Sequence, residues 1–235
     1  MRPGEKRRAM LVEVSETWKE SFPGAVVGTL AIGGVTNPPS HAGLEERKRE
    51  VEGQIRERFA GASAADIREM GVMQAYRNYY RRHKKSYHVQ LQLESMLFKG
   101  RSLPSVSALV DAMFIAEMKN LLLTAGHVLD AVRMPVEVEV SSSGERYTRL
   151  NGEEQVLKPG DMMMADRVGV ISSVLYGPDR RTRITPNTRR AFFVVYAPDG
   201  VGEQAVREHL EEIRDSVLLV APGAIVESLD IHVAG

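Results

Sequence analysis

The chain has 235 residues, with 31 Lys and Arg against 31 Asp and Glu, six His and no Cys. Because the formal net charge is zero, a cationic nucleic-acid coat, an acidic tail and a polybasic membrane anchor are excluded as the dominant feature. The lack of Cys excludes disulfides, thiolate nucleophiles and Cys-based zinc or iron–sulfur sites. The length and the 43% hydrophobic content are enough for one sizeable core.

No stretch approaches the roughly 18 to 20 continuous apolar residues that span a bilayer. The basic N-terminus lacks the apolar segment of a secretory signal, so we expect a cytoplasmic protein that makes no membrane contact. We expect one domain over residues 1–235. Within it, strands and helices over 1–69 precede a core over 70–200, and a helix and a strand follow over 201–235.

The hydrophobic pattern gives the expected elements in chain order. Helical periodicity predicts helices over 43–59, 64–70 with Ser63 as N-cap, 73–84, 91–98, a long buried helix over 106–123, and 202–219. Alternation and short apolar runs predict strands over 8–14, 25–32, 136–140, 147–150, 155–157, 162–165, 168–175, 191–196 and 226–233. Because helices cluster in the middle and strands follow, we expect an α+β module with a layered, mostly antiparallel β core flanked by helices.

Motifs for phosphate loops, dinucleotide binding, zinc proteases and nucleophile elbows are absent from the sequence. The six His never fall at metal-ligand spacing with a carboxylate on one helix face, so each is interpreted as an ordinary core or surface residue. The sequence therefore predicts no metal site and no cofactor.

Local charge is far from neutral between residues 75 and 101. This segment has seven basic residues and one acidic residue, Glu94, which gives a charge of seven minus one, or +6. The basic residues are Arg77, Arg81, Arg82, Lys84, Lys85, Lys99 and Arg101. A second basic cluster over 180–190 includes Arg181 and Arg183. Together these nine residues are the candidate RNA-binding set, because such cations neutralise phosphates.

Four tyrosines, Tyr76, Tyr79, Tyr80 and Tyr87, are interleaved with these cations. Flat rings beside cations are what unpaired bases stack on, which favours single-stranded RNA as the ligand. The alternative is that the rings belong to the core, since Tyr76 and Tyr80 share one helix face.

Three segments occur in a familiar order. They read YRNYYRR over 76–82, KGRSLPSVSALVD over 99–111, and RITPNT over 183–188 with the apolar strand AFFVV after it. The region from Tyr76 to Ala197 thereby resembles the B-three/B-four editing and tRNA-binding module of the phenylalanyl-tRNA synthetase beta subunit. It is more similar still to free-standing proteins built on that module.

The resemblance implies a compact α+β module that binds the acceptor end of tRNA and hydrolyses the ester of a wrongly attached amino acid. In such a double sieve, a second pocket removes the errors that one pocket cannot discriminate. The hydrolysis needs a positioned water and donors for the oxyanion rather than a dedicated nucleophile.

The same resemblance implies the site residues. Counted without gaps from Asp111, the family's polar pocket positions fall on apolar residues, and a shift of two residues would bring His127 to the position of the family His. The implied catalytic or supporting residues are His127, Asp111 and Asp130. The implied substrate-binding residues are Met113, Phe114, Ala125, Thr185 and Val194.

Three functions stay open on the sequence. The first is a free-standing aminoacyl-tRNA deacylase. The second is a non-catalytic binder of tRNA, or of a small apolar amino-acid-like ligand in the former editing pocket. The third is a partner-binding module that docks through the helices over 45–58 and 204–217. The oligomeric state is not predicted.

Overall fold

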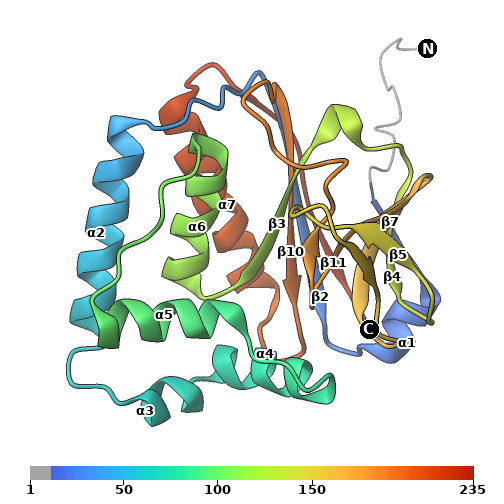
Figure 1. Cartoon of the computed structure of the whole chain (residues 1–235), viewed down its shortest axis with the longest axis horizontal. Coiled ribbons are helices and arrows are strands. Elements are labelled where there is room, and N and C mark those ends of the chain that lie inside the picture. The colour runs from blue at the N-terminus through green and yellow to red at the C-terminus, as the bar shows by residue number, and fades with distance from the viewer. Residues whose placement is uncertain (1–11) are drawn as a thin grey trace, which may run out of the picture.

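The computed structural model describes residues 12–235 and has two β-sheets packed face to face, with helices over the outer face of one sheet (Figure 1). The helices are α1 Glu16–Ser21, α2 Ala42–Arg58, α3 Ala64–Glu69, α4 Gly71–Arg82, α5 His88–Lys99, α6 Ala108–Asn120 and α7 Glu203–Val220. A short 3-10 helix, η1, covers Leu129–Ala131. The strand expected over 8–14 lies partly outside the described residues.

The first sheet is fully antiparallel and has the strand order β11-β2-β10-β3. Its strands are β2 Val26–Gly33, β3 Leu123–Val128, β10 Arg190–Ala197 and β11 Ile225–Val233. The second sheet has the order β1-β4-β7-β8-β9, and only its β1–β4 pair is parallel. Its strands are β1 Val12–Val14, β4 Val136–Val140, β7 Met162–Asp166, β8 Gly169–Ser173 and β9 Gly177–Pro178. A separate hairpin joins β5 Arg146–Thr148 to β6 Glu154–Val156.

This architecture confirms the expected α+β class with a mostly antiparallel, layered β core. The central strands β2 and β10 are buried along almost their whole length, because α6 and α7 cover one face of their sheet and the second sheet covers the other (Figure 1). Gly28 allows α7 to approach β2 closely, since a Cβ atom there would lie 2.4 Å from Cγ1 of Val206. One hydrophobic core includes residues from Val12 to Ala234. The subdivision at residues 69 and 200 stays a prediction.

The long helix expected over 106–123 is wrong at its C-terminal end. Helix α6 ends at Asn120, Leu121 adopts a left-handed conformation with φ of 62°, and the chain enters β3 at Leu123. Periodicity cannot separate a short apolar strand from the end of a buried helix, so the sequence pattern extends the helix to residue 123 and predicts no strand after it. The missed strand is the one that carries Ala125 and His127.

The helix start predicted at Ser63 is confirmed. The Ser63 Oγ accepts the Asp66 N–H at 3.3 Å, and the Asp66 carboxylate accepts the Ser63 N–H at 2.8 Å, which forms a capping box.

Within residues 12–235, no helix is both long and apolar enough to cross a membrane.

Candidate nucleic-acid interface

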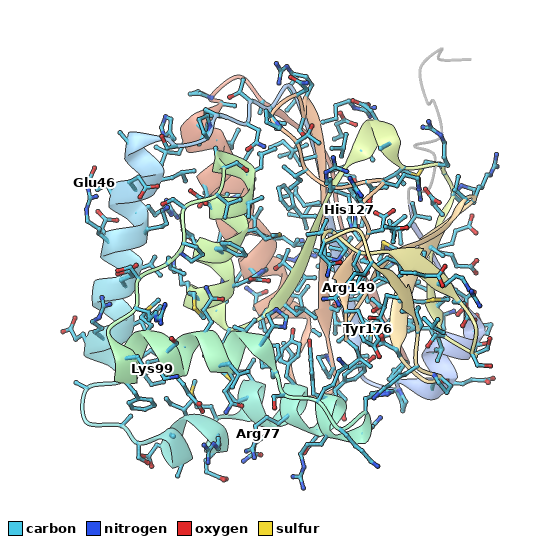
Figure 2. All side chains as sticks on the ribbon, in the orientation of Figure 1. Glu46, Arg77, Lys99, His127, Arg149 and Tyr176 are labelled. Atoms are coloured by element: carbon cyan, nitrogen blue, oxygen red, sulfur yellow. The ribbon has the colours of Figure 1, made fainter. Side chains whose placement is uncertain are left out.

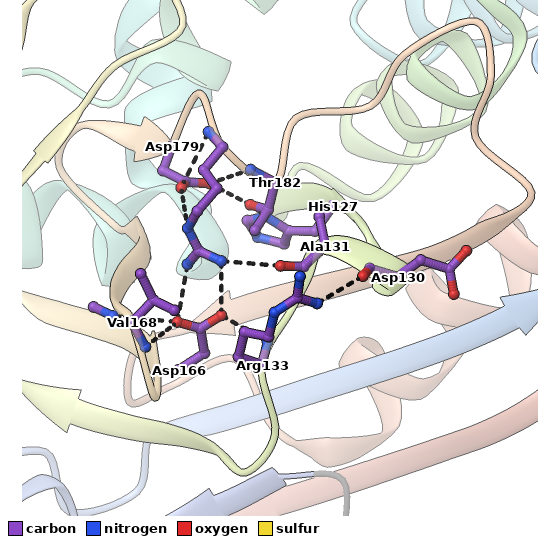
Figure 3. Close-up of polar contacts among 10 residues, drawn as sticks. His127, Asp130, Ala131, Arg133, Asp166, Val168, Asp179 and Thr182 are labelled. Atoms are coloured by element: carbon purple, nitrogen blue, oxygen red, sulfur yellow. Dashed lines mark hydrogen bonds and ion pairs between the residues drawn. The ribbon is translucent and has the colours of Figure 1, made fainter.

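His127 is buried on β3 in a polar network that Figure 3 shows. Its Nδ1 lies 2.7 Å from Oγ1 of Thr182, and the Thr182 hydroxyl donates to the carboxylate of Asp179. Because that hydroxyl has one hydrogen, Nδ1 of His127 must donate in turn, which leaves Nε2 unprotonated. Nε2 has no hydrogen-bond partner among residues 12–235. Burial, aided by the Arg181 charge, lowers the pKa of His127 to about 3.

The two carboxylates expected beside His127 serve other contacts. The Asp130 side chain points away from His127 (Figure 3). Its carboxylate accepts a hydrogen bond from Arg190 at 2.8 Å. Asp111 is fully buried at the start of α6, where it pairs with Lys48 at 3.1 Å. His127, Asp111 and Asp130 therefore do not converge on one site.

The expected substrate-binding residues lie on two faces of the first sheet. Ala125 and Val194 are register partners on β3 and β10. Since successive side chains alternate, Gly126 faces the other way, and a Cβ atom there would lie 3.3 Å from Sδ of Met113 on α6. Met113 is thus on the helical side of the sheet, whereas Ala125 and Val194 face the second sheet.

Phe114 and Thr185 belong with the helical side. Phe114 is half-buried on α6, next to Met113. The Thr185 carbonyl accepts a hydrogen bond from the Asn37 amide at 2.9 Å, and the amide oxygen of Asn37 accepts the Leu109 N–H at 2.9 Å. Asn37 therefore ties the segment over 183–188 to the first turn of α6, and the five expected residues do not form one pocket.

The charge of Arg181 is neutralised by acidic partners at the protein surface. Its guanidinium donates to the two Asp166 oxygens at 2.9 and 3.0 Å and to the Ala131 carbonyl at 2.9 Å, and it lies 3.6 Å from Asp179. Burial raises the pKa of Asp166, but the Arg133 N–H and the Arg181 guanidinium outweigh it and lower the pKa. Arg181 thus ties β7 to the segment after β9, which makes it a poor phosphate ligand. Arg183 is exposed and donates to the Arg180 carbonyl at 2.8 Å.

The expected aromatic stacking surface is wrong, and the core alternative is confirmed. All four tyrosines are buried, at 3% exposure or less. Their hydroxyls all donate inward. Tyr76 donates to the Tyr196 carbonyl at 2.6 Å, and Tyr79 donates to Oδ1 of Asp161 at 2.7 Å. Tyr80 donates to the Val174 carbonyl at 2.8 Å, and Tyr87 donates to the Leu121 carbonyl at 3.0 Å. Because three of these rings occupy the inner face of α4, the arginines between and after them lie on its outer face, whereas Tyr87 is the N-cap of α5.

The outward cations form what we call the α4–α5 basic surface, which consists of Arg77, Arg81, Arg82, Lys84 and Lys85. Within residues 12–235, none of these five side chains makes an ion pair. Arg77, Arg81 and Lys85 line a cavity of about 270 Å³ together with Arg68 and Glu94. The surface therefore presents unneutralised positive charge beside a hollow.

Lys85 also lines a second cavity, of about 370 Å³, which sequence reasoning missed. The other polar side chains around it are His88, Arg149, Gln155 and Tyr176. Arg149 and Tyr176 lie close together in Figure 2, and the Lys85 ammonium lies 4.3 Å from the centroid of the Tyr176 ring. These residues come from the α4–α5 turn, the start of α5, the β5–β6 hairpin and the β8–β9 turn, so no local pattern in the sequence could have grouped them.

Buried tyrosines fix the turn that carries Tyr176. The Tyr80 hydroxyl donates to the Val174 carbonyl at 2.8 Å, and the Tyr147 hydroxyl donates to the Gly177 carbonyl at 2.7 Å. Asp161 is buried between α4 and this turn, and burial raises its pKa to about 6. The tyrosines of α4 thus hold the wall of the cavity in place, which is a positioning role rather than a stacking role.

Residues 73–212 match the family model described as the B3/4 domain, which is well over half of the chain. The chain belongs to the B3/4-domain family. The match begins within α4 and ends within α7, so it includes the α4–α5 basic surface and the 370 Å³ cavity.

The fold of this B3/4 domain is also similar to a crystal structure of an N-terminal fragment of the phenylalanyl-tRNA synthetase beta-subunit from Pyrococcus horikoshii. The TM-score is 0.47 and the sequence identity is 14%, over 94% of this chain and 49% of that chain. The chain therefore spans about half the length of that fragment. A comparison with curated proteins finds no match.

Two expected RNA contacts of the B3/4 domain lie apart from the basic surface. Lys99 is exposed at the C-terminal end of α5, roughly 16 Å along the helix from His88 at a rise of about 1.5 Å per residue (Figure 2). Arg101 is exposed in the segment that follows α5. Among residues 12–235, no group of three or more His, Cys, Asp or Glu could hold a metal ion.

Proposed function

We propose that this B3/4 domain binds the acceptor end of tRNA through the α4–α5 basic surface. The observation that carries the proposal is the set of five cations without an acidic partner within residues 12–235, on a chain whose net charge is zero. By contrast, Arg181 in the second basic cluster pairs with Asp166 and Asp179. Free cations at one face attract phosphates, because binding them releases condensed counterions.

The tRNA partner follows from the resemblance of the B3/4 domain to a synthetase editing module, and the basic surface supplies the phosphate contacts. The neighbouring cavity supports an interface with unpaired nucleotides, because it combines cations with the accessible ring of Tyr176. Stacking on one ring gives little sequence preference, which suits the single-stranded end that all tRNAs share.

Anisotropy titration of a fluorescent acceptor-stem hairpin tests the proposal. The hairpin with its unpaired 3′ end should bind, and the same hairpin with a blunt end should bind several-fold more weakly. Arg81→Met should weaken binding, because Arg81 makes no ion pair within the described chain. Arg214→Met is the control, since Arg214 already pairs with Asp215 on α7. Equal binding of both hairpins would contradict recognition of the acceptor end.

Hydrolysis of a mischarged aminoacyl-tRNA ester is a second candidate. It is favoured by the chain of Asp179, Thr182 and His127, which leaves Nε2 of His127 without a proton or a partner within residues 12–235. Against it, a nitrogen with a pKa near 3 is a weak base, and His127 lines neither cavity of the interface. Incubation with a panel of mischarged tRNAs tests this candidate. Deacylation no faster than hydrolysis in buffer would exclude ester hydrolysis and leave tRNA binding as the function.

A small apolar amino-acid-like ligand at Ala125 and Val194 stays a prediction. Both side chains are buried against the second sheet, so such a ligand would have to separate the two sheets. A thermal-shift screen of amino acids tests it, and stabilisation by a branched or aromatic amino acid would support it.

A further inference from the structure

The cavity of about 370 Å³ beside the basic surface has the size and chemistry of a small-molecule site. Lys85, His88 and Arg149 line it together with Gln155 and Tyr176, and no carboxylate of residues 12–235 does. We propose that this cavity binds one nucleoside monophosphate unit, with the phosphate at Arg149 and Lys85 and the base on Tyr176. The inference rests on the proposed function, because the unit is taken to be part of an RNA strand.

Uncompensated charge indicates the phosphate. Arg149 is half-buried, and its guanidinium makes no hydrogen bond or ion pair within the described part of the chain. The Lys85 ammonium lies 4.3 Å from the centroid of the Tyr176 ring and makes no ion pair or hydrogen bond there, although its charge also acts on the buried carboxylate of Asp161. Two cations that share one cavity repel each other, and a phosphate placed between them removes that repulsion and forms charge-assisted hydrogen bonds.

The Tyr176 ring indicates the base. The hydroxyls of Tyr80 and Tyr147 donate to backbone carbonyls on both sides of Tyr176, so the backbone that carries the ring is fixed before a ligand arrives. Lys85 is a long and flexible side chain that can leave the ring for a phosphate, which frees the ring face for stacking. The Gln155 amide, at the edge of the same cavity, can hydrogen-bond the rim of a base.

The recognised unit is a base and a phosphate together, and this separates the site from a simple anion site. A free phosphate would use Arg149 and Lys85 but gain nothing from Tyr176. A nucleoside would use Tyr176 but leave the two cations unpaired. We therefore expect the monophosphate to bind more tightly than either of its parts.

Isothermal titration calorimetry of the full chain with AMP and CMP, beside adenosine, cytidine and inorganic phosphate, tests the site. Each monophosphate should bind at least tenfold more tightly than its nucleoside or phosphate alone. Arg149→Met and Tyr176→Leu should each weaken monophosphate binding at least tenfold, while Tyr176→Phe, which keeps the ring, restores it. The control Arg214→Met should leave binding within twofold of the parent.

Thermal melts establish that each variant is folded, and Gln155→Ala replaces Tyr176→Leu if that variant unfolds. Equal affinity for phosphate alone would overturn the inference in favour of an anion site, and no monophosphate binding by the folded parent would overturn it outright. If the chain binds tRNA but not monophosphates, the cavity inference fails and the proposed function stands. If it binds monophosphates but not tRNA, the cavity inference stands and the proposed function fails.

Discussion

The Tyr76 hydroxyl on α4 donates a 2.6 Å hydrogen bond to the carbonyl of Tyr196 on β10. The same oxygen accepts the Leu123 N–H at 3.0 Å, and Leu123 is the register partner of Tyr196 at the start of β3. One buried hydroxyl therefore closes the end of the β3–β10 ladder and attaches α4 to the first sheet. Because Tyr76 holds the inner face of α4 against the sheet, Arg77 and Arg81 are directed outward.

Tyr76→Phe should lower the free energy of unfolding by about 1–3 kcal/mol, because it leaves a buried N–H and a buried carbonyl without this partner. Urea denaturation measures the change. Tyr176→Phe is the matched control, since the Tyr176 hydroxyl makes no hydrogen bond within residues 12–235, and its effect should stay within about 0.5 kcal/mol. Equal losses for the two variants would show that the Tyr76 hydroxyl does not stabilise the sheet end.

Glu117→Gln should change how stability depends on pH. Glu117 is buried on α6, its carboxylate accepts the Thr124 N–H at 2.8 Å, and burial raises its pKa to about 8. Between about pH 4.5 and 8 the folded chain keeps a proton that the unfolded chain has lost, so this group lowers stability as pH rises. The glutamine variant keeps the acceptor oxygen and does not titrate.

Relative to the parent, Glu117→Gln should therefore gain on the order of 3 kcal/mol in unfolding free energy between pH 5 and pH 8. Denaturation at both pH values measures this gain, with Glu46→Gln at an exposed position of α2 as control (Figure 2). A gain no larger than that of the control would mean that Glu117 is ionised at neutral pH.

Thr182→Val should separate the structural role of the His127 network from RNA binding. The substitution removes the hydroxyl that joins His127 to Asp179, so it should lower the unfolding free energy by about 1–3 kcal/mol. Affinity for tRNA should change less than twofold, because neither cavity of the interface is lined by these residues. A large loss of affinity in a folded variant would place the network in the binding site.

The sequence predicts the fold better than the site, for physical reasons. The capping box of α3 and the hydrophobic periodicity of α2 and α7 are local, so they could be predicted from neighbouring residues. The end of α6 could not, because the three leucines at 121–123 that directly follow it are strong helix formers. The missed turn also concealed that Ala125 and Met113 lie on opposite faces of a sheet.

The basic cluster also shows that local features could be predicted from the sequence, whereas the packing of side chains could not. The sequence identified the charge of α4, but it could not show that Tyr76 and Tyr80 point into the core or that Arg181 pairs with Asp166. Arg149 and Tyr176 were missed because each is an isolated residue in its own segment. Only the packing of the β5–β6 hairpin and the β8–β9 turn against α5 brings them to Lys85.

The salt dependence of tRNA affinity tests the central claim most directly. Titration of the parent and of Lys85→Met from 50 to 200 mM salt measures it. If about three phosphates are neutralised, the affinity of the parent should fall roughly 20- to 40-fold, and Lys85→Met should show a log–log slope shallower by about 0.7 to 0.9. Affinity that does not change with salt, or a Lys85→Met slope equal to that of the parent, would contradict phosphate binding by the α4–α5 basic surface.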